Sequence, residues 1–413
     1  MIEPPIFDRN YLIALINSEA VEGDLRQFPA ISCASGLNAD AFIEKIADSG
    51  LRGKGGAGFP SAVKMKGFVD QPGSAKYLVV NGSEHEPGSL KDRYLLAEHP
   101  RTVLEGALCL GMCLGVNEIH FAVNENASTA IGGIEREVEN FNNSVLSIGN
   151  TAPDISLFVD RVPDQYIVGE ESALIQVLEG KEPKPRKRPP LPIESGLFGR
   201  PTLVHNVETV AHIPFILLAG GERYRTLGSE GAGVTLCTLG EEFRNPGVHL
   251  VSLGIPLQRL VDDVGQGLRN GEKIIAVQPG GPSSGFVTRD EFGCSFDENS
   301  LRDAGSSLGC AVVRGYSHSD SLVDEIAEIM SFYEESCCDQ CPQCRMETRM
   351  LASIMRQIAA GKGNSKLIEQ IPKIINANVD KGICGLIKMP VAPALTGLKK
   401  FANEFDNSWR SGD

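Results

Sequence analysis

The stretch Tyr77-Leu-Val-Val80-Asn-Gly-Ser-Glu84-His-Glu86-Pro-Gly88 decides the fold class of this chain. Its first four residues are apolar and strand-forming, and turn residues and acids follow directly, so we expect a buried strand that ends in a polar loop. Apolar runs at residues 119–123 and 155–159 predict two similar strands, and helical patterns over residues 99–114 and 128–143 separate the three. Strands that alternate with helices predict a parallel sheet in an α/β domain.

The loop after this strand carries the first candidate site. Loops at the carboxyl ends of parallel strands are where α/β sheets bind ligands. Glu84 and Glu86 lie in this loop, and a second acidic pair, Glu170 and Glu171, opens a predicted helix. Such carboxylates could do acid–base work or bind polar ligand edges. The alternative is that they cap helices and are otherwise solvated.

A glycine-rich stretch lies upstream, Leu51-Arg-Gly53-Lys-Gly55-Gly56-Ala-Gly58-Phe-Pro60. It satisfies G-x-G-x-x-G, but residues 42–49 before it have a helical pattern, whereas the dinucleotide fingerprint requires a strand there. The ordinary Rossmann interpretation therefore fails. The glycines still allow backbone N–H groups to approach a phosphate, and Lys54 and Lys64 add positive charge. The alternative is a flexible surface loop.

The composition restricts the class of protein. The chain has 413 residues, with 39 Lys and Arg against 53 Asp and Glu, so its formal charge is −14. At about 150 residues per domain, this length predicts two or three domains. The acidic balance argues against nucleic acid or an anionic membrane as the main partner. A transmembrane helix needs about 20 apolar residues, and no apolar run in the chain is that long. The first residues show no signal-peptide pattern. We therefore predict a cytoplasmic protein that is soluble or a peripheral subunit.

The pattern changes along the chain in a way that predicts four segments. Residues 1–45 are helical in pattern, residues 46–230 carry the α/β alternation, residues 231–318 hold short strands between glycine turns, and residues 319–413 are helical again. A basic, proline-rich run at residues 181–192 cannot form regular helix or a central strand. It is either a solvated loop or a holder for a negatively charged ligand.

The cysteines give the most specific signal. Cys338-Asp-Gln-Cys341-Pro-Gln-Cys344 lets three thiolates converge, and Cys384 can supply a fourth. Both a [4Fe–4S] cluster and zinc accept four thiolates, and three cysteines plus a remote one favour the cluster. Cys337 could replace Cys338 in a slipped register. The other six cysteines are predicted to pack in cores; they are Cys33, Cys109, Cys113, Cys237, Cys294 and Cys310.

Several motifs occur in a fixed order and together resemble one family. Besides the glycine stretch, the strand and loop at residues 80–88 and the cysteines, they are Lys91-Asp-Arg93, Tyr166-Ile-Val-Gly-Glu-Glu171 and Asn206-Val-Glu-Thr209. Over about residues 45–400 the chain resembles the NADH-binding flavoprotein subunit of respiratory complex I. Relatives of that subunit serve NAD-linked hydrogenases, formate dehydrogenases and aldehyde oxidoreductases.

The resemblance implies both a fold and a set of cofactors. It implies an α/β flavin- and NAD-binding domain at residues 46–230, a β-grasp-like soluble-ligand-binding domain at 231–318 and a helical bundle with a [4Fe–4S] cluster at 319–413. The flavin would be FMN, with FAD as the alternative, and NAD(H) would be the substrate.

By similarity, three groups of residues would form the sites. The flavin would be surrounded by Gly53, Lys54, Gly55, Lys64, Asn81, Ser83, Glu84, Tyr166, Gly169, Glu170, Asn206 and Thr209. The nicotinamide nucleotide would meet Gly56, Ala57, Phe59, Glu86, Glu171 and Arg188, of which Glu86 and Glu171 are the predicted catalytic residues. The cluster ligands would be Cys338, Cys341, Cys344 and Cys384.

The function implied is electron transfer. Hydride would pass between NAD(H) and the flavin, and single electrons would pass through the cluster to or from a partner iron–sulfur subunit of a larger complex. The alternatives are a docking subunit that has lost NAD turnover and a zinc-bound binding module. The docking alternative is motivated by departures from the family pattern. Ser83 replaces an aspartate, Arg188 a lysine and Leu191 a phenylalanine. Gly67, next to Phe68, stands where an aromatic residue is expected.

Overall fold

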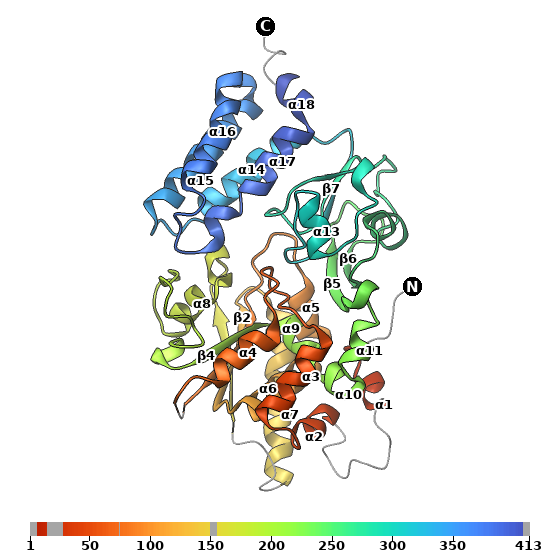
Figure 1. Ribbon diagram of the computed structural model, residues 1–413, viewed down its shortest axis with the longest axis vertical. Coiled ribbons are helices and arrows are strands. Elements are labelled where there is room, and N and C mark those ends of the chain that lie inside the picture. The colour runs from red at the N-terminus through yellow and green to blue at the C-terminus, as the bar shows by residue number, and fades with distance from the viewer. Residues whose placement is uncertain (1–5, 15–27, 74, 149–154, 408–413) are drawn as a thin grey trace.

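A four-stranded parallel sheet lies in the lower half of the molecule in Figure 1. The computed structural model describes residues 6–14, 28–73, 75–148 and 155–407. The strands lie in the order β3-β2-β1-β4, and every neighbouring pair is parallel. Their bounds are β1 Tyr77–Gly82, β2 Glu118–Asn124, β3 Ser156–Val162 and β4 Thr202–Asn206. The predicted α/β fold with a parallel sheet is confirmed.

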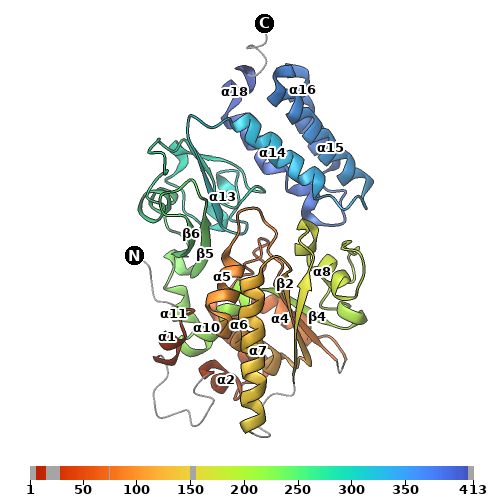
Figure 2. The same ribbon diagram turned by 180° about the vertical axis from the view of Figure 1, so that it is seen from behind.

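Strands β1, β2 and β4 are buried on both faces, which explains the apolar runs in β1 and β2, whereas the edge strand β3 is partly exposed. Successive side chains of a strand point to opposite faces. Leu78 and Val80 of β1 belong to the large core that holds helices α6 and α7, whereas Val79 belongs to a second core with Leu174 and Ile175 of α8. From behind, Figure 2 shows α5, α6 and α7 in front of the sheet.

Helices connect and surround the sheet. They are α1 Arg9–Ala14, α2 Pro29–Ala34, α3 Ala39–Ser49, α4 Ser61–Val69, α5 Lys91–Glu98, α6 Pro100–Leu114, α7 Ser128–Ile148, α8 Glu171–Leu178, α9 Val207–Ala211, α10 Ile213–Ala219 and α11 Gly221–Arg225. The helix α3 directly precedes the glycine-rich loop, as the sequence indicates, so no strand enters that loop.

The segment boundaries need one correction at the N-terminal side. The boundary predicted between residues 45 and 46 falls inside α3, and Phe42, Ile46 and Leu51 lie in one core together with Phe7 and Phe28. The N-terminal helices therefore pack as part of the α/β unit, because a continuous amphipathic helix cannot be divided between two cores. Residues 1–5, 15–27 and 408–413 of the predicted helical segments lie outside the described residues.

A second, mixed sheet follows in the order β6-β5-β9-β7-β8. The pair β5 and β9 is parallel, and the remaining pairs are antiparallel. The strands are β5 Val234–Leu239, β6 Gly247–Ser252, β7 Ala276–Gln278, β8 Val287–Thr288 and β9 Val312–Tyr316, with short helices α12 Leu257–Arg259 and α13 Glu298–Asp303.

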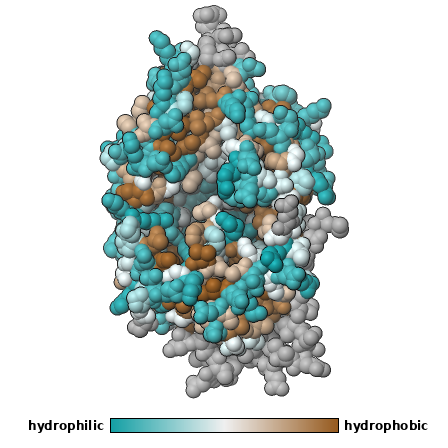
Figure 3. All heavy atoms as spheres, viewed as in Figure 1, coloured by the Kyte–Doolittle hydropathy of each residue, from teal (hydrophilic) through white to brown (hydrophobic). Residues whose placement is uncertain are grey.

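Helices form the C-terminal part at the top of Figure 1, and their apolar core also includes Ala276, Phe286 and Tyr316 of the second sheet region. They are α14 Leu322–Glu335, α15 Pro342–Gln357, α16 Ser365–Asn378, α17 Val391–Lys400 and α18 Ala402–Asn407. Among the described residues, no helix is long and apolar enough to cross a membrane. Figure 3 shows that the surface is hollowed near its middle, between these helices and the α/β part.

Candidate functional site

The glycine-rich loop forms a narrow turn at the base of α4. The backbone N–H of Gly53 donates to the carbonyl of Phe59 at 2.8 Å. The backbones of Arg52 and Pro60 form an isolated antiparallel β-bridge. Gly56 has φ +101°, a conformation open to glycine and strained for other residues. At Gly55 an added Cβ would lie 3.3 Å from the Cβ of Asn206. The loop therefore brings bare backbone close to the start of α9.

The predicted residues of this loop differ in their exposure. Ala57 and Phe59 are exposed, and 52 % of Phe59 is accessible. Lys54 is buried instead; its backbone N–H donates to Thr209 and its ammonium group donates to the carbonyl of Val234 at 2.8 Å. Burial lowers the pKa of Lys54 to about 8. Lys54 thus anchors the loop to β5, and the exposed backbone of the loop is what a phosphate could reach.

The loop after β1 joins the end of the sheet to the turn before α8. The amide of Asn81 donates to the carbonyl of Gly169 at 3.1 Å, and its oxygen accepts from the backbone N–H of Ser83. Asn206, at the end of the neighbouring strand β4, donates to the carbonyl of Asn81 at 3.4 Å. These contacts and the approach of Gly55 to Asn206 link five of the twelve predicted flavin residues in one continuous group.

Two predicted cofactor-binding glutamates act as helix caps. Glu84, at φ +35°, accepts from the backbone N–H groups of Asp92 and Arg93 at the start of α5, each at 2.9 Å. Glu170 accepts from the N–H groups of Ser172 and Ala173 at the start of α8, also at 2.9 Å. Capping satisfies orphan donors of a helix start. The helix-cap alternative therefore holds for both, and neither carboxylate is free to bind a ligand with both oxygens.

Glu171 sits between two cations. Lys64 donates to its Oε2 at 2.7 Å and to the carbonyl of Val204, and Arg188 approaches its Oε1 at 3.0 Å. Arg188 also donates to Oε1 of Glu170 at 2.6 Å. The basic segment therefore places Arg188 beside Glu170 and Glu171.

Most other cations of the basic segment pair locally. Lys181 and Arg186 contact Glu179, and Lys184 contacts Glu182. Such pairs neutralise the run of charge, so the segment as a whole is not an anion site. Its contribution to the site comes from Arg188.

Glu86 is held by hydroxyl groups from two different parts of the chain. The Tyr166 hydroxyl donates to its Oε2 at 2.9 Å, and the Ser283 hydroxyl from the second sheet donates to its Oε1 at 3.2 Å. Burial raises the pKa of Glu86, and the two hydroxyl donors oppose that shift. Both oxygens of this predicted catalytic residue are therefore oriented.

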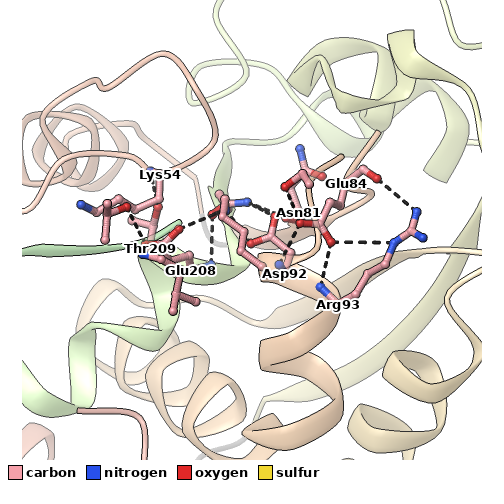
Figure 4. A network of polar contacts seen from close by, with 12 residues as sticks. Lys54, Asn81, Glu84, Asp92, Arg93, Glu208 and Thr209 are labelled. Atoms are coloured by element: carbon pink, nitrogen blue, oxygen red, sulfur yellow. Dashed lines mark hydrogen bonds and ion pairs between the residues drawn. The ribbon is translucent and has the colours of Figure 1, made fainter. Parts of the chain in front are cut away.

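Figure 4 shows a network of polar contacts that includes the buried charged side chains of Glu208 and Asp92. Glu208 of α9 is fully buried, and its carboxylate approaches the Lys91 ammonium at 3.2 Å. Lys91 also contacts Asp92 at 2.8 Å and donates to Asn206 at 3.1 Å. The Asn206 amide donates to Asp92 at 2.6 Å, which fixes the orientation of this predicted flavin residue.

The structure also shows how the departures from the family pattern are accommodated. Phe68 is fully buried, so it does not provide the aromatic surface missing at Gly67. At Gly67 an added Cβ would lie 3.0 Å from Ile193, so no larger side chain fits there without movement. Leu191 is 39 % exposed.

The cysteines of the metal motif gather in one apolar cluster. Cys341 and Cys344 are buried in it with Ile167 and Ala173, and the partly buried Cys337, Cys338 and Cys384 pack against it. Cys341 precedes the first residue of α15, and its sulfur accepts from the backbone N–H of Ile383 at 3.3 Å. The predicted ligands, remote in sequence, are thus brought together.

The gathered thiolates suit either kind of metal group by donor type. Tetrahedral zinc with bonds of about 2.3 Å holds its sulfurs about 3.8 Å apart, whereas each iron of a [4Fe–4S] cluster takes its own cysteine. The sulfurs of Cys337 and Cys344 lie 3.7 Å apart. Burial raises the pKa of Cys384 to about 11.

The turn between Cys338 and Cys341 contains a residue in the left-handed conformation. It is Asp339, whose φ is +59°. Aspartate is among the residues that tolerate this left-handed conformation better than others.

Several contacts of the site escape sequence reasoning, because they come from the second sheet and the C-terminal helices. Ser283 contacts Glu86, and an added Cβ at Gly56 would lie 3.5 Å from the sulfur of Cys310. The fully buried Tyr333 of α14 lies against Tyr166, with ring centroids 5.9 Å apart.

The cysteines predicted as core residues do not all lie in cores. Cys109, Cys113 and Cys237 are buried, as predicted, and Cys294 is partly buried. Cys33 is exposed, because it lies on the outer side of the short helix α2, and Cys310 lies at the glycine loop. For these two residues the core prediction is wrong.

Comparisons with known proteins match this arrangement. Residues 46–215 match a family model described as the Nuo51 FMN-binding domain, and residues 324–408 match one described as the NADH-ubiquinone oxidoreductase-F iron-sulfur binding region. An NADH-quinone oxidoreductase F subunit of Rhizobium meliloti is 33 % identical over 370 residues, 89 % of this chain and 88 % of that protein. The F subunit of the Escherichia coli enzyme is 32 % identical over 378 residues, 90 % of this chain and 85 % of that protein.

Solved structures share the fold. A chain of an NAD⁺-reducing [NiFe]-hydrogenase in the air-oxidised state superimposes with a TM-score of 0.85 at 25 % identity, over 98 % of this chain and 67 % of that chain. The H₂-reduced state gives a TM-score of 0.85 at 24 % identity, over 96 % of this chain and 69 % of that chain.

A glycine-rich flavin site beside a cysteine cluster defines an electron-transfer oxidoreductase subunit. The chain belongs to the family of NADH-quinone oxidoreductase F subunits. The predictions of FMN, a [4Fe–4S] cluster and NAD(H), and of an NADH oxidoreductase subunit, are confirmed.

Proposed function

We propose that this chain exchanges hydride between NAD(H) and FMN at the loop after β1, and exchanges single electrons with a partner iron–sulfur subunit through the cysteines around the start of α15. When bound, FMN supplies the conversion between a two-electron hydride and single electrons. The residues of the chain hold and orient the reactants.

One observation carries this proposal. Tyr166 donates to Glu86 on one side and packs against the apolar cluster of Cys341 and Cys344 on the other. A single side chain therefore separates the predicted nucleotide residue from the predicted metal ligands. That proximity is what electron exchange between two bound groups requires.

The residues divide the work by their contacts. The exposed backbone of the loop at Gly55 and Gly56 is free to approach a phosphate or a ring. Lys64 and Arg188 hold Glu171, and a bound nucleotide phosphate would compete for Arg188, which is partly exposed. Asn81 and Asn206 present fixed amides at the ends of adjacent strands.

The larger organisation is also part of the proposal. We assign the α/β unit to flavin and nucleotide binding, the mixed sheet to a β-grasp-like domain and the C-terminal helices to cluster binding. The topology β6-β5-β9-β7-β8 with its single parallel pair supports the β-grasp assignment. The cytoplasmic location stays a prediction.

Glu86→Gln is expected to keep FMN and to slow its reduction by NADH about ten- to hundredfold. A glutamine offers one acceptor oxygen in place of two, so Tyr166 or Ser283 loses its partner, and a hydrogen bond to a charged group is worth about 1.5–3 kcal/mol. Anaerobic stopped-flow reduction of purified, FMN-loaded protein measures the effect.

Glu139→Gln on α7 is the matched control, because Glu139 is exposed and lies on a helix outside the site. Its flavin should be reduced at the wild-type rate. An unchanged rate in Glu86→Gln would contradict the role of Glu86. Wild-type protein whose FMN is not bleached by millimolar NADH would contradict NAD turnover and favour the docking alternative.

A further inference from the structure

The turn between β7 and β8 reaches out of the second sheet and touches Glu86. At Gly281, with φ +84°, an added Cβ would lie 2.9 Å from Glu86 Oε1, so the carboxylate is pressed against the turn's backbone. The Ser283 hydroxyl donates to the same oxygen at 3.2 Å. The predicted nucleotide site is therefore walled by a part of the chain remote from the parallel sheet.

This turn is built to be rigid. The buried Ser284 hydroxyl accepts from the N–H of Gly280 and donates to the carbonyl of Gly281 at 2.8 Å. The N–H of Gly281 donates to the carbonyl of Val312 in β9 at 2.8 Å, and Gln278 donates to the carbonyl of Ser284 at 2.9 Å. Internal bonds of this kind fix the position of the Ser283 side chain before any ligand arrives, which is the condition for a preorganised site.

The surroundings of Glu86 contain neutral groups. Tyr166 donates to Oε2, and the buried Tyr333 of α14 and the Cys310 thiol face the same space. The pKa values of both tyrosines and of Cys310 are raised, chiefly by burial, so all three stay neutral at ordinary pH. Among these four side chains only Glu86 carries a charge, and Lys91, Asp92 and Glu84 are further charges that act on Cys310.

We propose that Ser283 is a positioning residue of the nucleotide site: it fixes Oε1 of Glu86 while Tyr166 fixes Oε2, so that the second sheet sets the ionisation and orientation of the carboxylate that faces the nicotinamide. This rests on the proposed function of Glu86. A donor to a carboxylate favours its charged form, so loss of the Ser283 hydroxyl makes Glu86 easier to protonate. The ionised carboxylate attracts the cationic ring of NAD⁺, and protonation weakens binding.

The test is the pH dependence of NAD⁺ binding to oxidised, FMN- and cluster-loaded protein, measured by calorimetric titration. We expect wild-type affinity to fall on the acid side, and the midpoint of that fall to move up by about one pH unit in Ser283→Ala, the equivalent of one charge-assisted hydrogen bond. Flavin and iron contents should be unchanged, and Glu86→Gln should abolish the acid fall.

Ser319→Ala is the matched control, because the exposed Ser319 donates to Glu272 at 2.8 Å in a similar serine–glutamate contact away from the site. Its midpoint should equal that of the wild type. If Ser283→Ala loses FMN, Ser283→Cys keeps the size with a weaker donor and should show a smaller shift in the same direction.

The outcomes distinguish failure of the proposed function from failure of the positioning role. Wild-type protein that does not bind NAD⁺ overturns the proposed function. Wild-type binding without an acid fall, or with the same midpoint in the Ser283 variants, overturns only the role of Ser283.

Discussion

Replacing Cys384 by alanine is expected to reduce the iron content from about four atoms per chain to less than one, and to stop electron transfer to a one-electron acceptor. Cys384 precedes a short turn before α17 and packs against the apolar cluster that holds Cys341 and Cys344, so it closes the ligand set from outside α15. NADH should still reduce the flavin, because none of the predicted flavin-binding residues is substituted. Iron and sulfide analysis, the visible spectrum and stopped-flow flavin reduction measure the three effects.

Control variants decide which cysteines are the ligands. Cys33→Ala is the matched control, because Cys33 is exposed on α2 and should keep full iron. Cys338→Ser should lose iron and Cys337→Ser should keep it. The reverse result would mean that Cys337 is the ligand, an interpretation favoured by its 3.7 Å approach to Cys344. Zinc without iron in the wild type would contradict the cluster.

The parallel sheet could be predicted from sequence because three of its strands appear as apolar runs. Strands β1 and β2 are buried on both faces, and the edge strand β3 keeps its apolar residues although it is partly exposed. Strand β4 could not, although Thr202–Asn206 completes the edge beside β1 and ends at the predicted residue Asn206. It is short, and it contains Thr202 and His205, both buried polar residues. Their burial depends on neighbours from elsewhere in the chain, so no local pattern could reveal it.

The candidate site divides in the same way. Residues at the end of a strand or just after it, such as Asn81 and Glu86, could be proposed as candidates because strand ends mark binding loops in α/β sheets. The sequence leaves the capping roles of Glu84 and Glu170 open, since a helix start attracts acids whether or not a ligand is near. Ser283 could not be found, because its contact with Glu86 spans 197 positions and depends on how two sheets pack.

Replacing Glu208 by alanine is expected to destabilise the protein by about 3–5 kcal/mol, the usual cost of removing one partner of a buried ion pair. The carboxylate accepts from the Thr235 hydroxyl at 2.9 Å and the Leu236 N–H at 2.8 Å, and it approaches Lys91 at 3.2 Å. The substitution leaves these two donors without their acceptor and a buried ammonium short of one counter-charge. The thermal midpoint should fall by about 4–6 °C.

The loss of stability in Glu208→Ala should be larger at neutral pH than in acid. Burial would raise the pKa of Glu208, but Lys91, His212 and Lys54 hold it well below its usual range. A depressed folded-state pKa gives stability that is present above the unfolded value of about 4.3 and lost as the pH falls through the folded value. The difference between wild type and Glu208→Ala should therefore be largest near neutral pH and shrink in acid.

Two controls make the result specific. Glu298→Ala removes an exposed ion pair with Arg302 on α13 and should lower the free energy of unfolding by less than about 1 kcal/mol. The loss in Glu208→Gln should lie between those of Glu298→Ala and Glu208→Ala. Equal midpoints in Glu208→Ala and the wild type would contradict the ion-pair account. Because Glu208 joins α9 of the α/β unit to β5 of the second sheet, its loss should also release FMN more easily, since Lys54 is tied to the same strand through Val234. The buried charge of Glu208 would then stabilise both the flavin site and the contact between the two sheets.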